Sequence, residues 1–312
     1  MGLSWASRFV QRFRHYLDGF LEFPGYPGLP EQPPRPERLP AFLAEVQARR
    51  FDLAIQMHGS GALTNPLVAL FGARCTAGWH VPGQFCPDAA WFLPYPEAES
   101  EVWRCLRLVE FLGAPIQDAA LELPIEEQDV ADLQAIEAAR RLVPGGYVCL
   151  HPGARATTRR WLPERFAAVA DGLAERGYPV VLTGSAAERP LAAAVSQAMR
   201  IRPIDLVGRT SFGALAALVR DARLVVCNDT GISHIAAALR VPSVIVVTAS
   251  SPERWAPEDR QRHRVVAHPV ACRPCRFDTC PIGFPCGTGV TEAAVLRAVD
   301  ELLAMERVAP CG

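Results

Sequence analysis

The sequence predicts an α/β protein whose second half forms a doubly wound, parallel β-sheet. In residues 146–250, short apolar runs rich in β-branched residues alternate with helical stretches, which is the pattern of consecutive βαβ units. A break at Pro144-Gly145-Gly146 precedes this alternation and indicates a domain boundary. The chain has 312 residues, which is enough for two domains of ordinary size.

In the first half of the sequence, the residue pattern predicts several helices and one clear strand. Residues 20–40 are rich in Pro and Gly and predict a long irregular loop. There follow a helix, a strand, a second helix, an irregular tract rich in Pro and aromatics, and a third helix: Glu37–Arg50, Phe51–Met57, Gly61–Phe71, Trp79–Pro96 and Glu97–Leu112. A charged helix, Glu126–Leu142, then ends at the boundary. The predicted domains are residues 1–125 and 146–312, joined by a linker helix in 126–145.

The second half predicts five strands and the helices that lie between and after them. The strands are Tyr147–His151, Pro179–Thr183, Ile204–Val207, Arg223–Cys227 and Ser243–Val247. The helices are Pro163–Arg176, Ala187–Arg200, Ser211–Asp221 and Gly231–Leu239. Ligands of such sheets bind beyond the carboxyl ends of the strands, so polar residues that directly follow a strand are the candidate site residues.

Composition argues against several classes of function. The 32 basic and 33 acidic residues give a net charge of −1, so no basic surface favours nucleic acid as a partner. No apolar run approaches the ~18 residues of a membrane span, and the N-terminus lacks the apolar segment of a signal peptide. We therefore expect a cytoplasmic protein. Arg8, Arg12 and Arg14 beside Phe9 and Phe13 predict either an ordinary amphipathic helix or one that contacts an anionic membrane surface.

The strongest local signal is the turn Asn228-Asp229-Thr230-Gly231-Ile232-Ser233-His234. It follows an apolar strand and leads directly into a helix, so free backbone N–H groups and the positive end of the helix dipole meet the sheet edge. A simpler interpretation is helix capping by Asp229 or Thr230, with His234 buried. Capping explains only one of four polar side chains on this turn. We therefore predict that Asp229, Thr230, Gly231 and His234 bind a phosphate-containing ligand.

A second polar junction follows an earlier strand, at His151-Pro152-Gly153-Ala154-Arg155, and continues to Arg159-Arg160-Trp161. Arginines in loops are commonly only solvated. Three of them between a strand end and a helix start are better explained by a diphosphate, so Ala154, Arg155, Arg159 and Arg160 are candidate binding residues. Glu188 follows the next strand. It either faces the dipole of its own helix or accepts a hydrogen bond from a ribose hydroxyl.

Four of the ten cysteines are grouped as Cys272-x2-Cys275-x4-Cys280-x5-Cys286. Without a secretion signal we expect them to be reduced. The first pair has zinc-ligand spacing and the second does not, so metal ligation and simple thiol packing both stay open. Because this loop is distant in sequence from both polar junctions, we expect a structural role for it.

Several motifs of other enzyme classes are absent from the sequence. The chain contains no Asp-x-Asp, no Gly-x4-Gly-Lys-Ser/Thr and no Gly-x-Ser-x-Gly. These absences argue against metal-bridged phosphate binding, P-loop hydrolysis and the esterase elbow.

The two junctions together resemble glycosyltransferase family nine, the lipopolysaccharide heptosyltransferases that use ADP-heptose. Asp229-Thr230-Gly231-Ile232-Ser233-His234 matches the family's Asp-Thr-Gly-x-x-His turn. Pro152-Gly153-Ala154 with Arg159-Arg160-Trp161-Leu162-Pro163 is similar to its Pro-Gly-Ala loop, with Arg159 in place of the usual lysine. The strand Phe51–Met57, followed by His58-Gly59, resembles a family strand that ends in Gln-Gly. The resemblance covers about residues 50–305. It implies two facing Rossmann-like domains, the GT-B arrangement, with the nucleotide-sugar held mainly by the C-terminal one.

One departure concerns the N-terminal domain. The family begins with a strand and a Gly-Asp turn whose aspartate is proposed as the catalytic base, and the chain has no such segment. We therefore expect an incomplete N-terminal domain and reduced turnover. His58 is the remaining candidate for the base.

The resemblance implies an inverting, metal-independent transfer of a heptose, or a related sugar, from an ADP-sugar to a lipopolysaccharide-core-type acceptor. It implies no cofactor. It also implies that the protein is located in the cytoplasm or peripherally at the inner membrane. Two alternatives stay open. The chain could be a catalytically impaired, nucleotide-binding remnant of the family, or a GT-B relative of the UDP-sugar epimerase type that uses another nucleotide.

Overall fold

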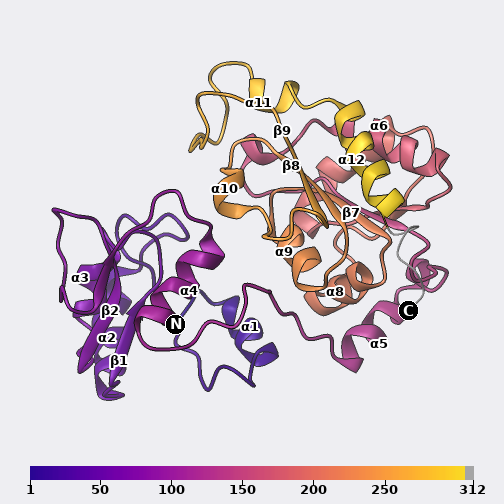
Figure 1. Cartoon of the computed structure of the whole chain (residues 1–312). Coiled ribbons are helices and arrows are strands. Elements are labelled where there is room, and N and C mark those ends of the chain that lie inside the picture. Colours follow the sequence, from indigo (N-terminus) through magenta and orange to yellow (C-terminus); the bar gives the residue numbers. More distant parts are fainter. Residues whose placement is uncertain (306–312) are drawn as a thin grey trace. The chain divides into compact units, whose positions relative to one another are not determined.

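The computed structural model describes residues 1–305 of the chain. The chain divides into two compact units, Met1–Ala119 and Ala120–Gly312, called unit 1 and unit 2 below. Each unit contains a parallel sheet with helices packed around it (Figure 1), so the predicted α/β class is confirmed. The predicted linker helix lies at the start of unit 2 and is shorter than expected. Ile136 adopts extended backbone angles and divides it into α5 (Glu127–Ala135) and the 3-10 turn η2 (Glu137–Ala139).

Unit 1 contains a three-stranded parallel sheet in the order β1-β2-β3. The strands are Leu53–Gln56, Cys75–His80 and Phe92–Pro94. The helices are α1 (Ala6–Arg12), η1 (Pro36–Arg38), α2 (Leu39–Ala48), α3 (Thr64–Ala69) and α4 (Glu101–Phe111). A small core of Phe42, Val46, Leu67 and Phe71 holds α2 and α3 together. The expected incompleteness of the N-terminal domain stays a prediction.

Strands β2 and β3 lie where the sequence predicts none. β3 falls inside the tract Trp79–Pro96, which is predicted to be irregular, and pairs with β2 between Gly78 and His80. At Gly78, a Cβ atom would lie 2.8 Å from Gln56 of β1, so only glycine fits there. These segments become strands through pairing with distant residues, and this outweighs their weak local β-propensity.

Unit 2 contains a six-stranded parallel sheet in the order β6-β5-β4-β7-β8-β9. The strands are Val148–His151 (β4), Val180–Leu182 (β5), Ile204–Asp205 (β6), Leu224–Asn228 (β7), Ser243–Val247 (β8) and His263–Ala267 (β9). Five of these confirm predicted strands. Edge strand β9 was not predicted, because only its Val265-Val266 pair is strongly apolar. From β4 the chain adds strands outward on one side, and from β7 it adds them on the other. The point where the winding reverses therefore lies between β4 and β7, which is where doubly wound sheets bind ligands.

Helices cover both faces of this sheet. They are α6 (Pro163–Glu175), α7 (Arg189–Ala198), α8 (Phe212–Arg220), α9 (Gly231–Ala238), α10 (Pro252–Trp255), α11 (Pro285–Thr288) and α12 (Glu292–Met305), with the 3-10 turns η3 (Thr157–Arg159) and η4 (Ala186–Glu188). Successive residues of a strand point to opposite faces. Accordingly, Leu150 and Val226 pack with α6, α7 and α12, whereas Cys149 and Cys227 pack with α5, α8 and α9. Both thiols are fully buried, and burial raises their pKa.

A buried histidine in unit 2 predicts acid sensitivity. His263 is 2% exposed, its Nδ1 lies 2.8 Å from Ser243 Oγ, and burial lowers its pKa from 6.5 to about 4. The unfolded chain therefore binds a proton that the folded chain does not, and stability falls as the pH drops below 6.5. We expect unit 2 to lose about 2 kcal/mol between about pH 7.5 and about pH 5 from this residue, measured by urea unfolding. His263→Gln should flatten this dependence. The exposed His268→Gln is the matched control, and an equal flattening by it would contradict the assignment.

Candidate functional site

The two polar junctions predicted from the sequence lie side by side in unit 2. β4 and β7 are paired neighbours, with His151 opposite Cys227, so the loops that follow them leave the same edge of the sheet. This edge is also the point where the winding of the sheet reverses. The fold thus places both junctions where a doubly wound sheet offers a ligand crevice.

Asn228 connects the two junctions. Its side chain has no exposed surface. Its Oδ1 accepts a hydrogen bond from the Trp161 N–H at 3.0 Å, and its Nδ2 donates one to the Pro152 carbonyl at 2.7 Å. Both ends of the arginine-containing loop are therefore fixed to the last residue of β7. This role of Asn228 was not predicted, although an amide side chain at the end of an apolar strand is a usable signal for it.

Trp161 anchors the far end of the same loop. It is fully buried, it packs edge-on against Phe166 with ring centroids 5.1 Å apart, and its Nε1 donates to the Val290 carbonyl at 3.2 Å. In the Arg-Arg-Trp sequence the tryptophan therefore lies in the core and fixes the backbone, whereas the two arginines before it are only half-buried.

The three arginines of the loop have different roles. Arg160 braces the loop itself, because its Nε donates to the Ala154 carbonyl at 2.7 Å and its Nη2 to the Arg155 carbonyl at 3.3 Å. In the part of the chain that the structure describes, the guanidinium groups of Arg155 and Arg159 have no hydrogen-bond or ion-pair partner. Arg155 is exposed and Arg159 is half-buried beside the junction. Arg159 is thus the better placed of these two to meet an anion.

The Asp-Thr-Gly turn holds its aspartate rigidly. Asp229 is 5% exposed, and its Oδ2 accepts a hydrogen bond from the hydroxyl of Ser250, which is 2% exposed. Its backbone N–H donates to the Val246 carbonyl at 3.1 Å. Ser250 follows β8, so three neighbouring strands contribute to the site. Sequence reasoning missed Ser250, which has no local signal.

The start of α9 is open to a ligand. Thr230 is the N-cap residue, and within residues 1–305 the N–H groups of Thr230 and Gly231 make no hydrogen bond. A Cβ atom added to Gly231 would meet no atom within 4 Å. The site therefore offers two backbone donors and the positive end of a helix dipole next to free space.

His234 lies one turn into α9 and is half-buried. Burial lowers its pKa, and the negative charge of Asp229 offsets this only in part. The imidazole is therefore neutral at neutral pH and can donate or accept a hydrogen bond. Its ring lies edge-on to that of Trp255 in α10, with centroids 6.5 Å apart. Arg254 covers the same indole at 5.0 Å.

Glu188 caps its own helix and also closes over the first junction. Its Oε2 accepts hydrogen bonds from the Ser185 N–H at 2.7 Å and the Ser185 hydroxyl at 2.8 Å. A Cβ atom added to Gly153 would lie 2.0 Å from Glu188 Oε1, so only glycine admits the carboxylate there. The buried His151 beside it has a lowered pKa, because burial disfavours its charged form. Capping and a further role for Oε1 are compatible.

His58 lies in unit 1, just beyond β1. It is largely exposed, and its Nε2 lies 3.1 Å from Glu31 Oε1. Both residues line a mainly apolar cavity of about 720 Å³ between the carboxyl end of β1, α3 and the N-terminal segment. Glu31 was not predicted, since it stands in a loop with no local pattern.

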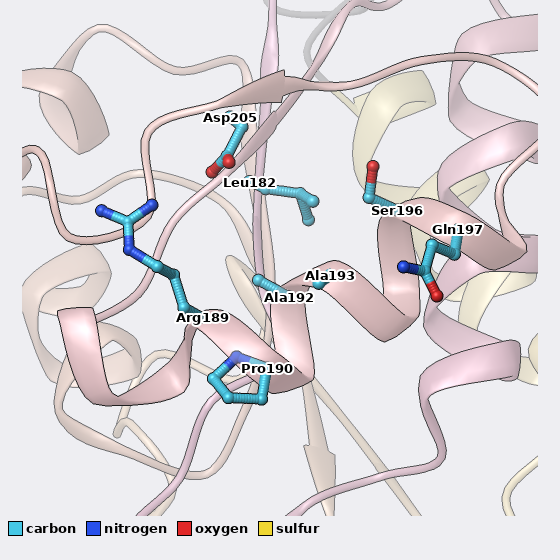
Figure 2. A pocket seen from close by; sticks show the side chains of 8 residues that line it. All are labelled: Leu182, Arg189, Pro190, Ala192, Ala193, Ser196, Gln197 and Asp205. Atoms are coloured by element: carbon cyan, nitrogen blue, oxygen red, sulfur yellow. The ribbon is translucent and has the colours of Figure 1, made fainter.

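A second groove lies in unit 2, between α7 and the edge strand β6, with a volume of about 490 Å³. Figure 2 shows Arg189 and Asp205 toward one end of it and Ser196 and Gln197 toward the other. None of the residues predicted from the sequence lines this groove. It is separate from the two junctions.

The four clustered cysteines form no metal site in the described residues. Within residues 1–305, no three His, Cys, Asp or Glu side chains are grouped so that they could hold a metal ion. Cys272 is exposed and Cys286 is buried, and burial raises the pKa of the Cys286 thiol. Cys280 Sγ accepts a hydrogen bond from the Phe284 N–H at 3.2 Å.

The chain is similar to known glycosyltransferases. Residues 41–284 match the family Glycosyltransferase family 9 (heptosyltransferase). Lipopolysaccharide heptosyltransferase 2 of Escherichia coli K12 is 33% identical over 161 residues, which are 50% of this chain and 46% of that protein. Alignments with curated relatives of this kind span between a third and a half of the relatives' length.

Solved structures show the same fold. A family 9 glycosyl transferase from Veillonella parvula gives a TM-score of 0.69 at 21% identity, covering 88% of this chain and 81% of that one. The ADP-heptose lps heptosyltransferase II of E. coli gives 0.66 at 21% identity, covering 98% and 89%. Both neighbours are of the GT-B type. None of the helices described in residues 1–305 is both long and apolar enough to cross a bilayer.

Proposed function

The chain belongs to glycosyltransferase family 9, and we propose that it transfers a heptose or a related sugar from an ADP-sugar to a lipopolysaccharide-core-type acceptor. The observation that carries this proposal is the joined pair of junctions in unit 2. One provides an unpaired arginine, and the other provides two free backbone donors at a helix start. The similarity to lipopolysaccharide heptosyltransferases supports the sugar and the acceptor class.

In the proposed step, an acceptor hydroxyl attacks the anomeric carbon and inverts it. The bond from that carbon to the diphosphate breaks, and its electron pair leaves with ADP. Negative charge then grows on the departing phosphate. Arg159 and the N–H groups of Thr230 and Gly231 would stabilise this charge electrostatically, and no metal ion is needed for that purpose.

The remaining residues of unit 2 would orient the donor. Asp229, fixed by Ser250, accepts hydrogen bonds from sugar hydroxyls. The neutral His234 donates to a phosphate or sugar oxygen. Glu188 Oε1 accepts from a ribose hydroxyl, while its Oε2 stays with Ser185.

The acceptor's proton needs a base, and unit 1 offers His58. If Nε2 donates to Glu31, Nδ1 is left as the basic nitrogen. The apolar cavity beside it would suit the lipid-linked side of an acceptor. This role, together with peripheral contact of the N-terminal arginines with the inner membrane, is part of the proposal.

Nucleotide titrations test the donor site directly. Of ADP, UDP and GDP, ADP should bind most tightly by calorimetry. Asp229→Ala should weaken the binding of ADP-heptose by about fivefold, because hydrogen bonds from sugar hydroxyls to a fixed carboxylate contribute about 1 kcal/mol or more. Glu258→Gln, which removes an exposed carboxylate elsewhere in unit 2, is the control.

Turnover separates the proposal from its alternatives. Release of ADP from ADP-heptose in the presence of a lipid-A-core acceptor supports the transferase. ADP binding without release would identify a nucleotide-binding remnant. A preference for UDP would favour the epimerase-like alternative instead.

A further inference from the structure

The segment Cys272–Cys286, called the cysteine loop here, is far in sequence from both junctions, but in the fold it contacts the first junction and the end of β8. It follows β9 and leads into α11 (Figure 1). Most of its side chains are exposed, Phe277 and Ile282 among them. The loop is therefore held by specific polar contacts rather than by a core of its own.

The first set of contacts ties the loop to the end of β8. Arg273 Nε donates to the Thr248 carbonyl at 2.8 Å, and its Nη2 donates to the Val247 carbonyl at 3.1 Å. The Cys275 N–H donates to the Ala249 carbonyl at 2.8 Å. The loop is thus fixed directly before Ser250, the residue that holds Asp229.

The second set ties the loop to η3, the turn that ends in Arg159. Thr158 Oγ1 donates to the Phe277 carbonyl at 2.7 Å, and Thr157 Oγ1 donates to the Asp278 carbonyl. The carbonyl of Thr158 in turn accepts a hydrogen bond from Thr248 Oγ1 at 2.7 Å. Thr158 is 4% exposed and Thr248 is 1% exposed. The turn is therefore held between the end of β8 and the cysteine loop.

These contacts lie one residue from the arginine assigned to the diphosphate. In the described chain the Arg159 side chain has no partner of its own, so its position follows from the backbone of η3. That backbone is fixed at Thr158 by two hydrogen bonds to separate segments. A charged side chain that is already held in position stabilises an anion better than a mobile one, because binding then costs less conformational entropy.

We infer that the cysteine loop is a positioning element of the nucleotide site, which sets Arg159 for the diphosphate through Thr157 and Thr158. This inference rests on the proposed function and adds residues that act through Arg159. It also assigns the loop a role in binding, whereas the sequence predicted only a structural one.

The test compares ADP with adenosine, which lacks the phosphates. Thr158→Val keeps the shape of the side chain but removes the donor to Phe277. We expect it to weaken ADP binding by about fivefold, the loss of one hydrogen bond, and to leave adenosine binding unchanged. Thr158→Ser keeps the hydroxyl and should restore the wild-type ratio of the two affinities. The exposed Thr157→Val should lower ADP affinity in the same direction and does not disturb a buried site.

A double-mutant cycle tests whether the effect passes through Arg159. In an Arg159→Ala background, Thr158→Val should cause no further loss of ADP affinity. An unchanged ratio of ADP to adenosine affinity in both threonine variants would overturn the inference, as would an equal loss with and without Arg159. The wild-type titration reports separately on the proposed function, because a wild-type protein that binds no nucleotide contradicts that function itself.

Discussion

Asn228→Ala is expected to destabilise unit 2 and to remove most of its affinity for ADP. The change leaves the Trp161 N–H and the Pro152 carbonyl without partners in a site that has no exposed surface. An unpaired buried group costs about 1–3 kcal/mol, so we expect a loss of about 2–5 kcal/mol in the free energy of unfolding. The loop between Pro152 and Trp161 also loses its attachment to β7. ADP affinity should therefore fall by more than tenfold, about as much as the loss of one charge-assisted hydrogen bond would cause. Urea unfolding and calorimetry measure the two effects.

Two controls separate these effects. Asn228→Asp keeps an acceptor for the Trp161 N–H but cannot donate to Pro152, so its loss of stability should be intermediate. Asn65 is a matched buried amide in unit 1, 1% exposed, whose Nδ2 donates to the Trp79 carbonyl at 3.0 Å. Asn65→Ala should cost stability but leave ADP affinity intact. Full ADP affinity in a folded Asn228→Ala protein would show that the two junctions do not depend on one another.

Arg159→Ala should produce the largest loss of transfer activity. The side chain would neutralise charge that grows on the leaving phosphate, and removal of one such group typically lowers the rate by about 10²- to 10³-fold. ADP affinity should fall less, by roughly tenfold or more, since a charge-assisted hydrogen bond contributes about 1.5–3 kcal/mol. The measurements are kcat/KM for ADP release and Kd for ADP.

Charge and position are tested separately at this residue. Arg159→Lys keeps the charge and supplies the residue more usual at this place in the family, so it should retain most of the affinity. Arg189→Ala removes an exposed arginine of the same unit, in the separate groove of Figure 2, and should leave both constants unchanged. An equal loss of ADP affinity in Arg159→Ala and Arg189→Ala would indicate a long-range effect of removing one positive charge rather than the loss of a direct contact.

The sequence alone predicted the α/β class, five of the six strands in the sheet of unit 2, and the two junctions of the site. The α/β class and the five strands are confirmed by the structure, and these predictions rest on local signals. Apolar runs of strand length alternate with amphipathic helices, and parallel strands carry their polar ends to one edge of the sheet. The turn from Asp229 to His234 was recognisable for the same reason, since all its polar residues are adjacent in the chain.

The local patterns failed where structure depends on distant partners. β3 has only three residues and β2 is only weakly apolar, and the two become strands through pairing with each other and of β2 with β1. β9 is likewise an edge strand defined by β8. The helix predicted as one from Glu126 to Leu142 divides at Ile136, whose extended backbone no residue pattern signalled.

Only the tertiary structure decided how the candidate site is held. Asn228 and Trp161 are 67 residues apart, and Thr158 and Phe277 are 119 apart. No periodicity links residues at such separations, because their hydrogen bonds form only after the sheet has brought the loops together. The same contacts separate Arg160, which braces its own loop, from Arg159, which stays free for an anion in the described chain. The sequence thus determined which residue types meet at the sheet edge, and the fold determined which of them are held by partners and which have none in the described chain.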